Sequence, residues 1–293
     1  MLELSHPDIL SKKIRLLSMR DFSYVLLNRI GIKALSRGIP HLILNEFPKS
    51  GGTWIGKMVA RSTGLPFPRN NPFNPFVPSL LHCHLLHTPA RTTQLIVWRD
   101  PRDVIVSWYY HCFFSHGLTN EKFVAFNRAL PGYENPDAVT ENLERFITDN
   151  FEHNLFMKWS WNVYAQNWLG DERSVFCRYE DFLHEPAQEL QRLSPLLGKG
   201  ELSEEQATQA ASYFSMQAER ERAGKSSPEA GGFIRQGKFG GWRDVMTENA
   251  HKTLLSYVSP YLEPLGYTAE GQILPLPARP LATESKNASQ RAL

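Results

Sequence analysis

The stretch His41-Leu-Ile-Leu-Asn-Glu-Phe-Pro-Lys-Ser-Gly-Gly-Thr-Trp54 decides how the rest of the chain is interpreted. Residues 42–47 are mostly apolar and are followed by a proline, a pattern typical of a short buried strand. Ser50-Gly51-Gly52 then allows a sharp turn, because glycine tolerates positive φ angles. From Thr53 the apolar spacing becomes helical, and Gly64 suits the end of that helix. The stretch therefore predicts a strand, a glycine turn and a helix.

Such a turn points backbone N–H groups and the positive end of the helix dipole at one place, which favours an anion there. Lys49 adds a mobile positive charge beside the turn. The order differs from the GxxxxGK[ST] loop of nucleoside triphosphatases, because here the lysine precedes the glycines. We expect a phosphate-type group at this loop, and the alternative from this stretch alone is an ordinary strand–turn–helix corner.

Composition limits the class of protein. With 293 residues, of which 42% are hydrophobic, the chain is long enough for a sizeable core in one domain or two. A net charge of +2 does not favour nucleic acid as a partner. Three cysteines without a CxxC pattern fit a reducing compartment, and from the apolar pattern we expect neither a transmembrane run nor a signal peptide. We therefore expect a cytoplasmic protein.

The two ends of the chain differ from its middle. Residues 11–37 mix basic and apolar side chains, which predicts one or two helices packed on the domain; a helix lying weakly on a membrane surface is the alternative. The last residues lack periodicity, which is typical of disorder. We expect an N-terminal helical segment (1–40), a single domain (41–268) and a disordered tail (269–293).

Histidines follow the first helix, in a predicted strand at 81–86. His82 and His84 are two residues apart and share a face of that strand, and His87 follows closely. The pattern leaves three roles open: a general base, a metal ligand, or a histidine with its hydrogen bonds satisfied in the core. No acidic or cysteine cluster at ligand spacing supports a metal site elsewhere.

Several segments between residues 41 and 242 resemble motifs of the cytosolic-type sulfotransferases, in that family's order. Pro48–Trp54 resembles the 5′-phosphosulfate loop PKSGTTW. His82-Cys-His84-Leu resembles KTHLP, with His84 at the position of the general base. Arg99–Ser107 resembles RxPxDxxxS, whose arginine and serine hold the 3′-phosphate of the nucleotide. Residues 178–186 resemble the YEDL segment, and 232–242 resemble the RKGxxGDW loop.

The resemblance implies a three-layer αβα domain with a central parallel sheet and a P-loop-like phosphosulfate loop, and the alternation of predicted strands and helices agrees. It implies 3′-phosphoadenosine 5′-phosphosulfate (PAPS) as sulfuryl donor, its bisphosphate (PAP) as product, and no metal. Lys49 and His84 would be catalytic. The residues expected to bind the nucleotide are Lys49, Ser50, Gly51, Gly52, Thr53, Trp54, Arg99, Ser107, Tyr179, Arg235, Gln236 and Gly237.

The chain departs from the family's motifs at four positions. Gly52 replaces a threonine of the loop, and its N–H remains for the 5′-phosphate. His82 replaces the lysine of KTHLP. Gln236 and Gly241 replace the lysine of RKG and the aspartate of GDW. These changes weaken the match at the nucleotide and acceptor edges.

The segment 66–78 suggests the kind of acceptor. Its prolines hold Phe67, Phe73 and Phe76 on a stiff connection between the first helix and the strand that carries His84. We expect these rings to help bind an apolar, aromatic or lipid-like molecule that presents a hydroxyl or an amine; the alternative is that they cover the core. A P-loop small-molecule kinase and a non-catalytic nucleotide-binding scaffold are the other functions that the sequence leaves open.

Overall fold

The computed structural model describes residues 19–35, 38–69, 71–88, 93–115, 121–226 and 237–276. Four parallel strands form one sheet in the order β2-β1-β3-β4. They are β1 (Leu42–Glu46), β2 (Leu80–Cys83), β3 (Gln94–Trp98) and β4 (Ser174–Arg178). All their residues are buried, as expected for a parallel sheet covered on both faces.

One face of the sheet is covered by a layer of four helices. These are α3 (Gly52–Thr63), α8 (Tyr179–His184), α9 (Pro186–Leu196) and α10 (Glu204–Tyr213). Their apolar side chains pack on Leu44, Val97 and Cys177 of the strands. Helix α11 (Met216–Ser226) follows this layer in the chain.

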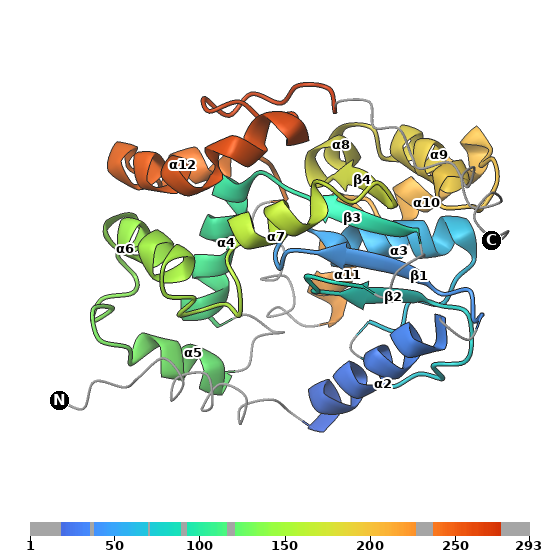
Figure 1. Ribbon diagram of the computed structural model, residues 1–293, viewed down its shortest axis with the longest axis horizontal. Helices are drawn as coiled ribbons and strands as arrows, with labels where there is room; N and C mark the ends of the chain where they lie inside the picture. The colour runs from blue at the N-terminus through green and yellow to red at the C-terminus, as the bar shows by residue number, and fades with distance from the viewer. Residues whose placement is uncertain are drawn as a thin grey trace, which may run out of the picture.

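The opposite face carries a more aromatic layer, and Figure 1 shows the sheet between the two layers. It contains α4 (Pro101–Phe113), α6 (Val139–Phe151), α7 (Trp161–Trp168) and α12 (Glu248–Leu262). Trp98 of β3 lies at its centre, with ring centroids 5.3 Å from Phe176 and 5.5 Å from Tyr164. The remaining helical segments are α5 (Glu121–Arg128) and the 3₁₀ turns η2 (Gly241–Asp244) and η3 (Glu263–Leu265).

Helix α2 (Met19–Leu35) packs beside the edge strand β2. Ile32 joins a small apolar cluster with Leu81 and Cys83, and Asn28 donates a hydrogen bond to the backbone oxygen of His82 at 2.8 Å. Residues 11–18 and 36–37 lie outside the described residues, so the membrane-surface alternative for 11–37 remains a prediction. Within the described ranges, no helix combines the length and apolar character needed to cross a bilayer.

Three segments differ from the sequence-based expectation. The strand predicted at 81–86 ends at Cys83, so His84 lies just beyond the strand. The helix predicted at 203–222 is two helices, because Ser215 begins α11 by accepting a hydrogen bond from the N–H of Ala218 at 3.2 Å. Residues 269–276, assigned above to the tail, are held in place: Arg178 donates to the backbone oxygen of Leu274 at 2.7 Å. Residues 277–293 lie outside the described residues.

Candidate active site

A cavity of about 340 Å³ opens at the carboxyl ends of the strands, where ligands bind in open parallel sheets. It is lined from the loop after β1, the end of β2, the loop after β3, and helices α4, α8 and α11. Most of the residues predicted to bind the nucleotide line it. They are Lys49, Gly51, Gly52, Thr53, Trp54, Arg99, Ser107, Tyr179 and Gly237, together with the predicted base His84.

The loop after β1 takes the tight turn that its sequence predicts. Lys49 and Gly51 both have positive φ angles, 75° and 92°. At Gly51 a side chain would also collide, because a Cβ atom would lie 2.4 Å from the Tyr179 ring. Glycine is therefore required there. Helix α3 begins immediately afterwards, and its first residues Gly52, Thr53 and Trp54 line the cavity, so the positive end of the helix dipole lies beside it.

Lys49 and Arg99 concentrate positive charge beside this turn. Burial, and then the neighbouring charge of Arg99, lower the pKa of Lys49 to about 8. Arg99 donates to the backbone oxygen of Lys49 at 3.0 Å, and its guanidinium lies 4.4 Å from the centre of the Tyr179 ring. Its Nε is buried and has no partner among the described residues. The pair is thus arranged to receive a buried anion.

Trp54 and Tyr179 form an aromatic wall of the cavity. Their rings meet edge to face with centroids 5.6 Å apart. Trp54 is fixed by a 2.6 Å hydrogen bond from its indole N–H to the backbone oxygen of Phe214. A flat aromatic base can pack against such a wall.

Asp103 anchors the segment 237–242, whose first residues Gly237 and Lys238 line the cavity. Its carboxylate accepts from the backbone N–H groups of Gly240 at 2.6 Å and Trp242 at 3.0 Å. Asp100 is the N-cap of α4, and its carboxylate accepts from the side chain of Arg102 at 2.7 Å. The predicted contacts of Arg235 and Gln236 lie outside the described residues.

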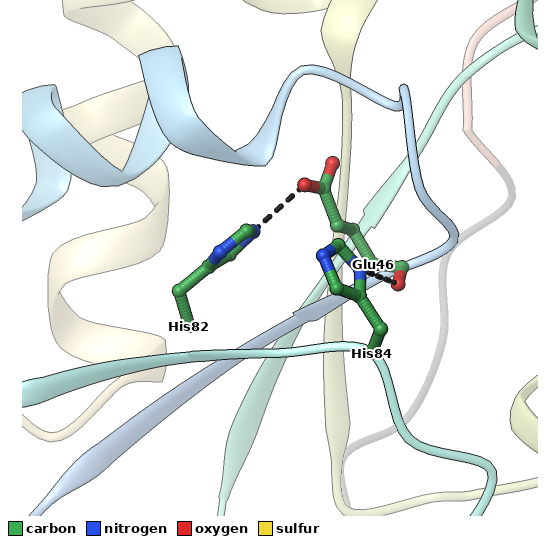
Figure 2. Close-up of side chains that lie close together, drawn as sticks. All are labelled: Glu46, His82 and His84. Carbon is green, nitrogen blue, oxygen red and sulfur yellow. Dashed lines mark hydrogen bonds and ion pairs between the residues drawn. The ribbon is translucent and has the colours of Figure 1, made fainter. Parts of the chain in front are cut away.

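The carboxylate of Glu46 connects β2 to the start of α3 (Figure 2). Its Oε1 lies 2.7 Å from Nε2 of His82, and its Oε2 accepts from the Gly52 N–H at 2.6 Å. Burial alone would raise the pKa of Glu46, but the hydrogen bond and charge of His82 outweigh it and lower that pKa to about 2. Burial lowers the pKa of His82 to about 4. At neutral pH an ionised carboxylate therefore accepts from a neutral imidazole.

His84 is oriented by the backbone of the same residue. Its Nδ1 lies 3.0 Å from the Glu46 backbone oxygen, which can only accept, so Nδ1 carries the proton and Nε2 the lone pair. Burial lowers the pKa of His84 as well. The imidazole is thus neutral, fixed in one tautomer and able to take a proton at the cavity.

Two of the departures from the family's motifs are explained by Glu46. A Cβ atom on Gly52 would lie 2.6 Å from the carboxyl carbon of Glu46, so a threonine does not fit beside this carboxylate. His82, in place of lysine, supplies its buried hydrogen-bond partner. The Gly52 N–H, expected at the 5′-phosphate, donates to Glu46 instead.

The Pro–Phe segment contributes to the cavity through a residue that the sequence did not single out for it. Arg69 lines the cavity and donates to the hydroxyl of Thr53 at 3.0 Å. Phe67 packs against Gly56 and Phe73 joins the cluster under α2, while Phe76 is 55% exposed. None of the three rings is among the cavity-lining residues of the described chain.

Helix α4 supplies two further wall residues that the sequence reasoning missed. Trp108 and His111 line the cavity and lie 5.0 Å apart, ring to ring. Trp108 directly follows Ser107 on α4, and His111 lies one helical turn after it. Because the sequence placed Ser107 on a helix at the site, its helical neighbours could have been predicted to line the cavity. Met216 and Lys238 complete the rim.

Comparison with known proteins now identifies the family. The family model described as "Sulfotransferase domain" matches residues 69–262, more than half of the chain. The chain belongs to the sulfotransferase domain family. Sulfotransferase 6B1 of Danio rerio is 25% identical over 256 residues, covering 76% of this chain and 78% of that protein. Sulfotransferase 1E1 of Rattus norvegicus is 23% identical over 284 residues, covering 78% and 87%.

Solved sulfotransferase-like structures share the fold. Mouse sulfotransferase SULT7A1 complexed with PAP aligns with a TM-score of 0.56 and 17% identity, over 76% of this chain and 84% of that one. Retinol dehydratase complexed with retinol and PAP aligns with a TM-score of 0.53 and 18% identity, over 77% and 82%. Together with the parallel sheet between two helical layers, these matches confirm the predicted family and α/β fold class.

Proposed function

We propose that this sulfotransferase moves a sulfuryl group from PAPS to the hydroxyl of a small molecule with a substantial apolar part. The observation that carries the proposal is that Lys49, from the loop after β1, and His84, just past β2, line one cavity. The first is suited to a leaving phosphate and the second to an acceptor proton. The relatives solved with PAP support the choice of nucleotide.

The nucleotide would lie along the α3 and α4 side of the cavity. Lys49 and the positive end of the α3 dipole face the 5′-phosphate position. Arg99 and Ser107 hold the 3′-phosphate, since a guanidinium binds phosphate through two parallel hydrogen bonds. Trp54 and Tyr179 pack against adenine. We assign Arg235, and the backbone near Gly237, to the 3′-phosphate as the family motif implies.

The reaction needs a base on one side of the sulfur and positive charge on the other. Nε2 of His84 accepts the hydroxyl proton as the acceptor oxygen forms a bond to sulfur. The bond between sulfur and the bridging phosphate oxygen breaks, and its electron pair leaves on the 5′-phosphate of PAP. Lys49 stabilises that developing charge, which is the electrostatic part of catalysis. Every step uses groups of the cavity and the two substrates.

The acceptor would lie against Trp108 and His111 of α4, with its hydroxyl at Nε2 of His84. Aromatic side chains favour an apolar body. Retinol dehydratase has been solved with androsterone and with retinol, small molecules of this kind, which supports the proposal. An amine acceptor would use the same base.

The experiment is a transfer assay with sulfur-labelled PAPS and a panel of phenols, sterols, fatty alcohols, amines and anionic sugars. We expect label in one or more apolar hydroxyl compounds, and its loss in Lys49→Ala. Label found only in strongly anionic sugars would contradict the acceptor class. Transfer of the γ-phosphate of ATP, with none from PAPS, would contradict the function and support a kinase.

A further inference from the structure

Three potential metal ligands lie close together (Figure 2), and two of them line the cavity at what we call its inner corner. Ligand atoms of Glu46, His82 and His84 all lie within 4.8 Å of one another. The side chains of Glu46 and His82 are almost fully buried, with exposed fractions of 5% and 1%. Glu46 and His84 line the cavity, and His82 lies behind them. The cluster therefore has one side open to the cavity.

The donor set suits a particular class of ion. Two imidazoles and one carboxylate form a common zinc-binding set, and they also bind other late divalent transition metals.

Hydrogen bonds with neighbouring backbone groups orient two of the three side chains, as is common around metal ligands. The Gly52 N–H bonds one oxygen of Glu46. The Glu46 backbone oxygen holds Nδ1 of His84 and so leaves Nε2 available. Such contacts fix tautomer and orientation, and in metalloproteins their loss weakens binding.

We propose that Glu46, His82 and His84 form a binding site for a divalent cation of the zinc class, entered from the cavity. Bond lengths near 2.0–2.2 Å place tetrahedral ligand atoms roughly 3.3 Å apart, so the three side chains move closer together when the ion binds. The proton on Nε2 of His82 moves to Nδ1 as the ion replaces the hydrogen bond to Glu46. Water from the cavity occupies the fourth position.

Neighbouring residues explain why these three groups, and not others nearby, form the site. His87 follows on the same segment but is exposed and lies outside the cluster. Cys83 faces the opposite side of β2, in the apolar cluster with Ile32 and Leu81.

The positive charges of the cavity limit the affinity. Lys49, Arg69 and Arg99 line the same cavity and repel a cation. We therefore expect a dissociation constant on the order of micromolar, weaker than that of a structural zinc site. This range suits a site that fills and empties.

Occupancy has a consequence that rests on the proposed function. An ion on Nε2 of His84 takes the lone pair that the base needs, so zinc inhibits sulfuryl transfer and a chelator restores it. The binding measurement below needs no activity. Absence of sulfuryl transfer with any acceptor would overturn the proposed function and leave the cation site standing.

The test uses the purified full chain, with Co²⁺ followed by its visible absorption and Zn²⁺ followed by calorimetry. We expect one ion per chain in the wild type. Glu46→Gln and His82→Asn should each bind at least about 10-fold more weakly, whereas His87→Asn should bind like the wild type. Unchanged affinity in His82→Asn, or a loss confined to His87→Asn, would overturn the proposal.

Folding of the variants is checked by cooperative thermal unfolding. If Glu46→Gln and His82→Asn do not fold, X-ray absorption of the zinc-loaded wild type decides. Two imidazoles with oxygen ligands support the site, and a sulfur ligand or oxygen ligands alone overturn it.

Discussion

The two sides of the cavity are built in different ways. On the side proposed for the nucleotide, the turn before α3 and the start of α4 are each formed within one short stretch of sequence. At the inner corner, Glu46 from β1 meets His82 from β2 and the N–H of Gly52 in α3. The first side is local along the chain, whereas the second depends on contacts between separate elements.

This difference has a physical consequence for substitution. At the corner, one carboxylate satisfies an imidazole and a helix N-terminus together, and its volume excludes a side chain at Gly52. Departures from the family's motifs at Gly52 and His82 therefore belong to one arrangement around Glu46.

The largest effect is expected at the two proposed catalytic positions, one on each side. Lys49→Ala and His84→Ala should each lower turnover by about 10²–10⁴-fold while the fold stays intact, because each removes a group that acts in the transition state. Label transfer from PAPS at saturating donor measures this. His87→Ala, an exposed histidine on the same segment, serves as control and should keep normal turnover. Near-normal turnover in His84→Ala would show that another group is the base.

A smaller loss is expected for nucleotide binding in Arg99→Ala. Removing one partner of a charged, partly buried contact costs roughly 2–5 kcal/mol. Calorimetry should show this as weaker PAP binding, with a smaller effect on the rate at saturating PAPS. Arg99→Lys should recover part of the affinity, since it keeps the charge and loses the paired geometry. Equal PAP affinity in wild type and Arg99→Ala would remove Arg99 from the 3′-phosphate.

The contact between Gly52 and Glu46 at the inner corner is tested by the free energy of unfolding. Gly52→Ala should destabilise the protein by about 1–3 kcal/mol, because the new methyl group collides with the Glu46 carboxylate. The cost should be smaller when Glu46 is also alanine, which a double-mutant cycle in urea measures. Gly170→Ala is the matched control, since a Cβ atom there meets nothing within 4 Å. Additive free energies would show that the two positions are independent.

The acceptor wall should respond more weakly still. Trp108→Ala should raise the KM for an apolar acceptor by roughly 10-fold and leave the KM for PAPS unchanged, as loss of uniform binding does. Phe76→Ala should change neither, because Phe76 is 55% exposed. Phe73→Ala should lower stability without a change in acceptor KM, since Phe73 packs under α2. If the acceptor KM rose in Phe76→Ala but not in Trp108→Ala, the acceptor would bind at the Pro–Phe segment and not at Trp108.

The smallest signal concerns the protonation of Lys49. Its pKa of about 8 leaves it half protonated near pH 8, and a bound phosphate raises that pKa by favouring the ammonium. PAP binding at pH 8 should therefore take up about half a proton, and less as the pH falls below 7. Calorimetry in buffers of different ionisation enthalpy measures the uptake. Lys49→Met should abolish the proton uptake. Proton release by the wild type would contradict the expected rise in the pKa of Lys49.

The same contrast explains what the sequence could predict. The glycine turn, the helix start at Pro101 and the placement of Arg99 and Ser107 depend on neighbouring residues, and the structure places them as predicted. The carboxylate of Glu46 meets His82 only because β1 pairs in parallel with β2, with Leu44 opposite His82. The signal that was missed is a charged residue at the end of an apolar strand, which is rarely buried without a partner.

Two other errors of the sequence reasoning have a similar origin. The helix predicted at 203–222 divides because Ser215 offers a side-chain cap that competes with helical continuation. The rings of the Pro–Phe segment were assigned to the acceptor from their stiffness and position. Their partners Gly56 and Leu81 lie on other elements, and those contacts turn two of the rings into core.

The most direct test of the account is the thermal unfolding of the wild type and Arg99→Ala with PAP, with ATP plus Mg²⁺, and without ligand. A PAP site in this cavity predicts stabilisation of the wild type by about 2.7 kcal/mol at a concentration 100-fold above the dissociation constant. It predicts a much smaller shift in Arg99→Ala and little effect of ATP. Equal stabilisation of both proteins by PAP, or stabilisation by ATP plus Mg²⁺ alone, would contradict the assignment of this cavity to the sulfuryl donor.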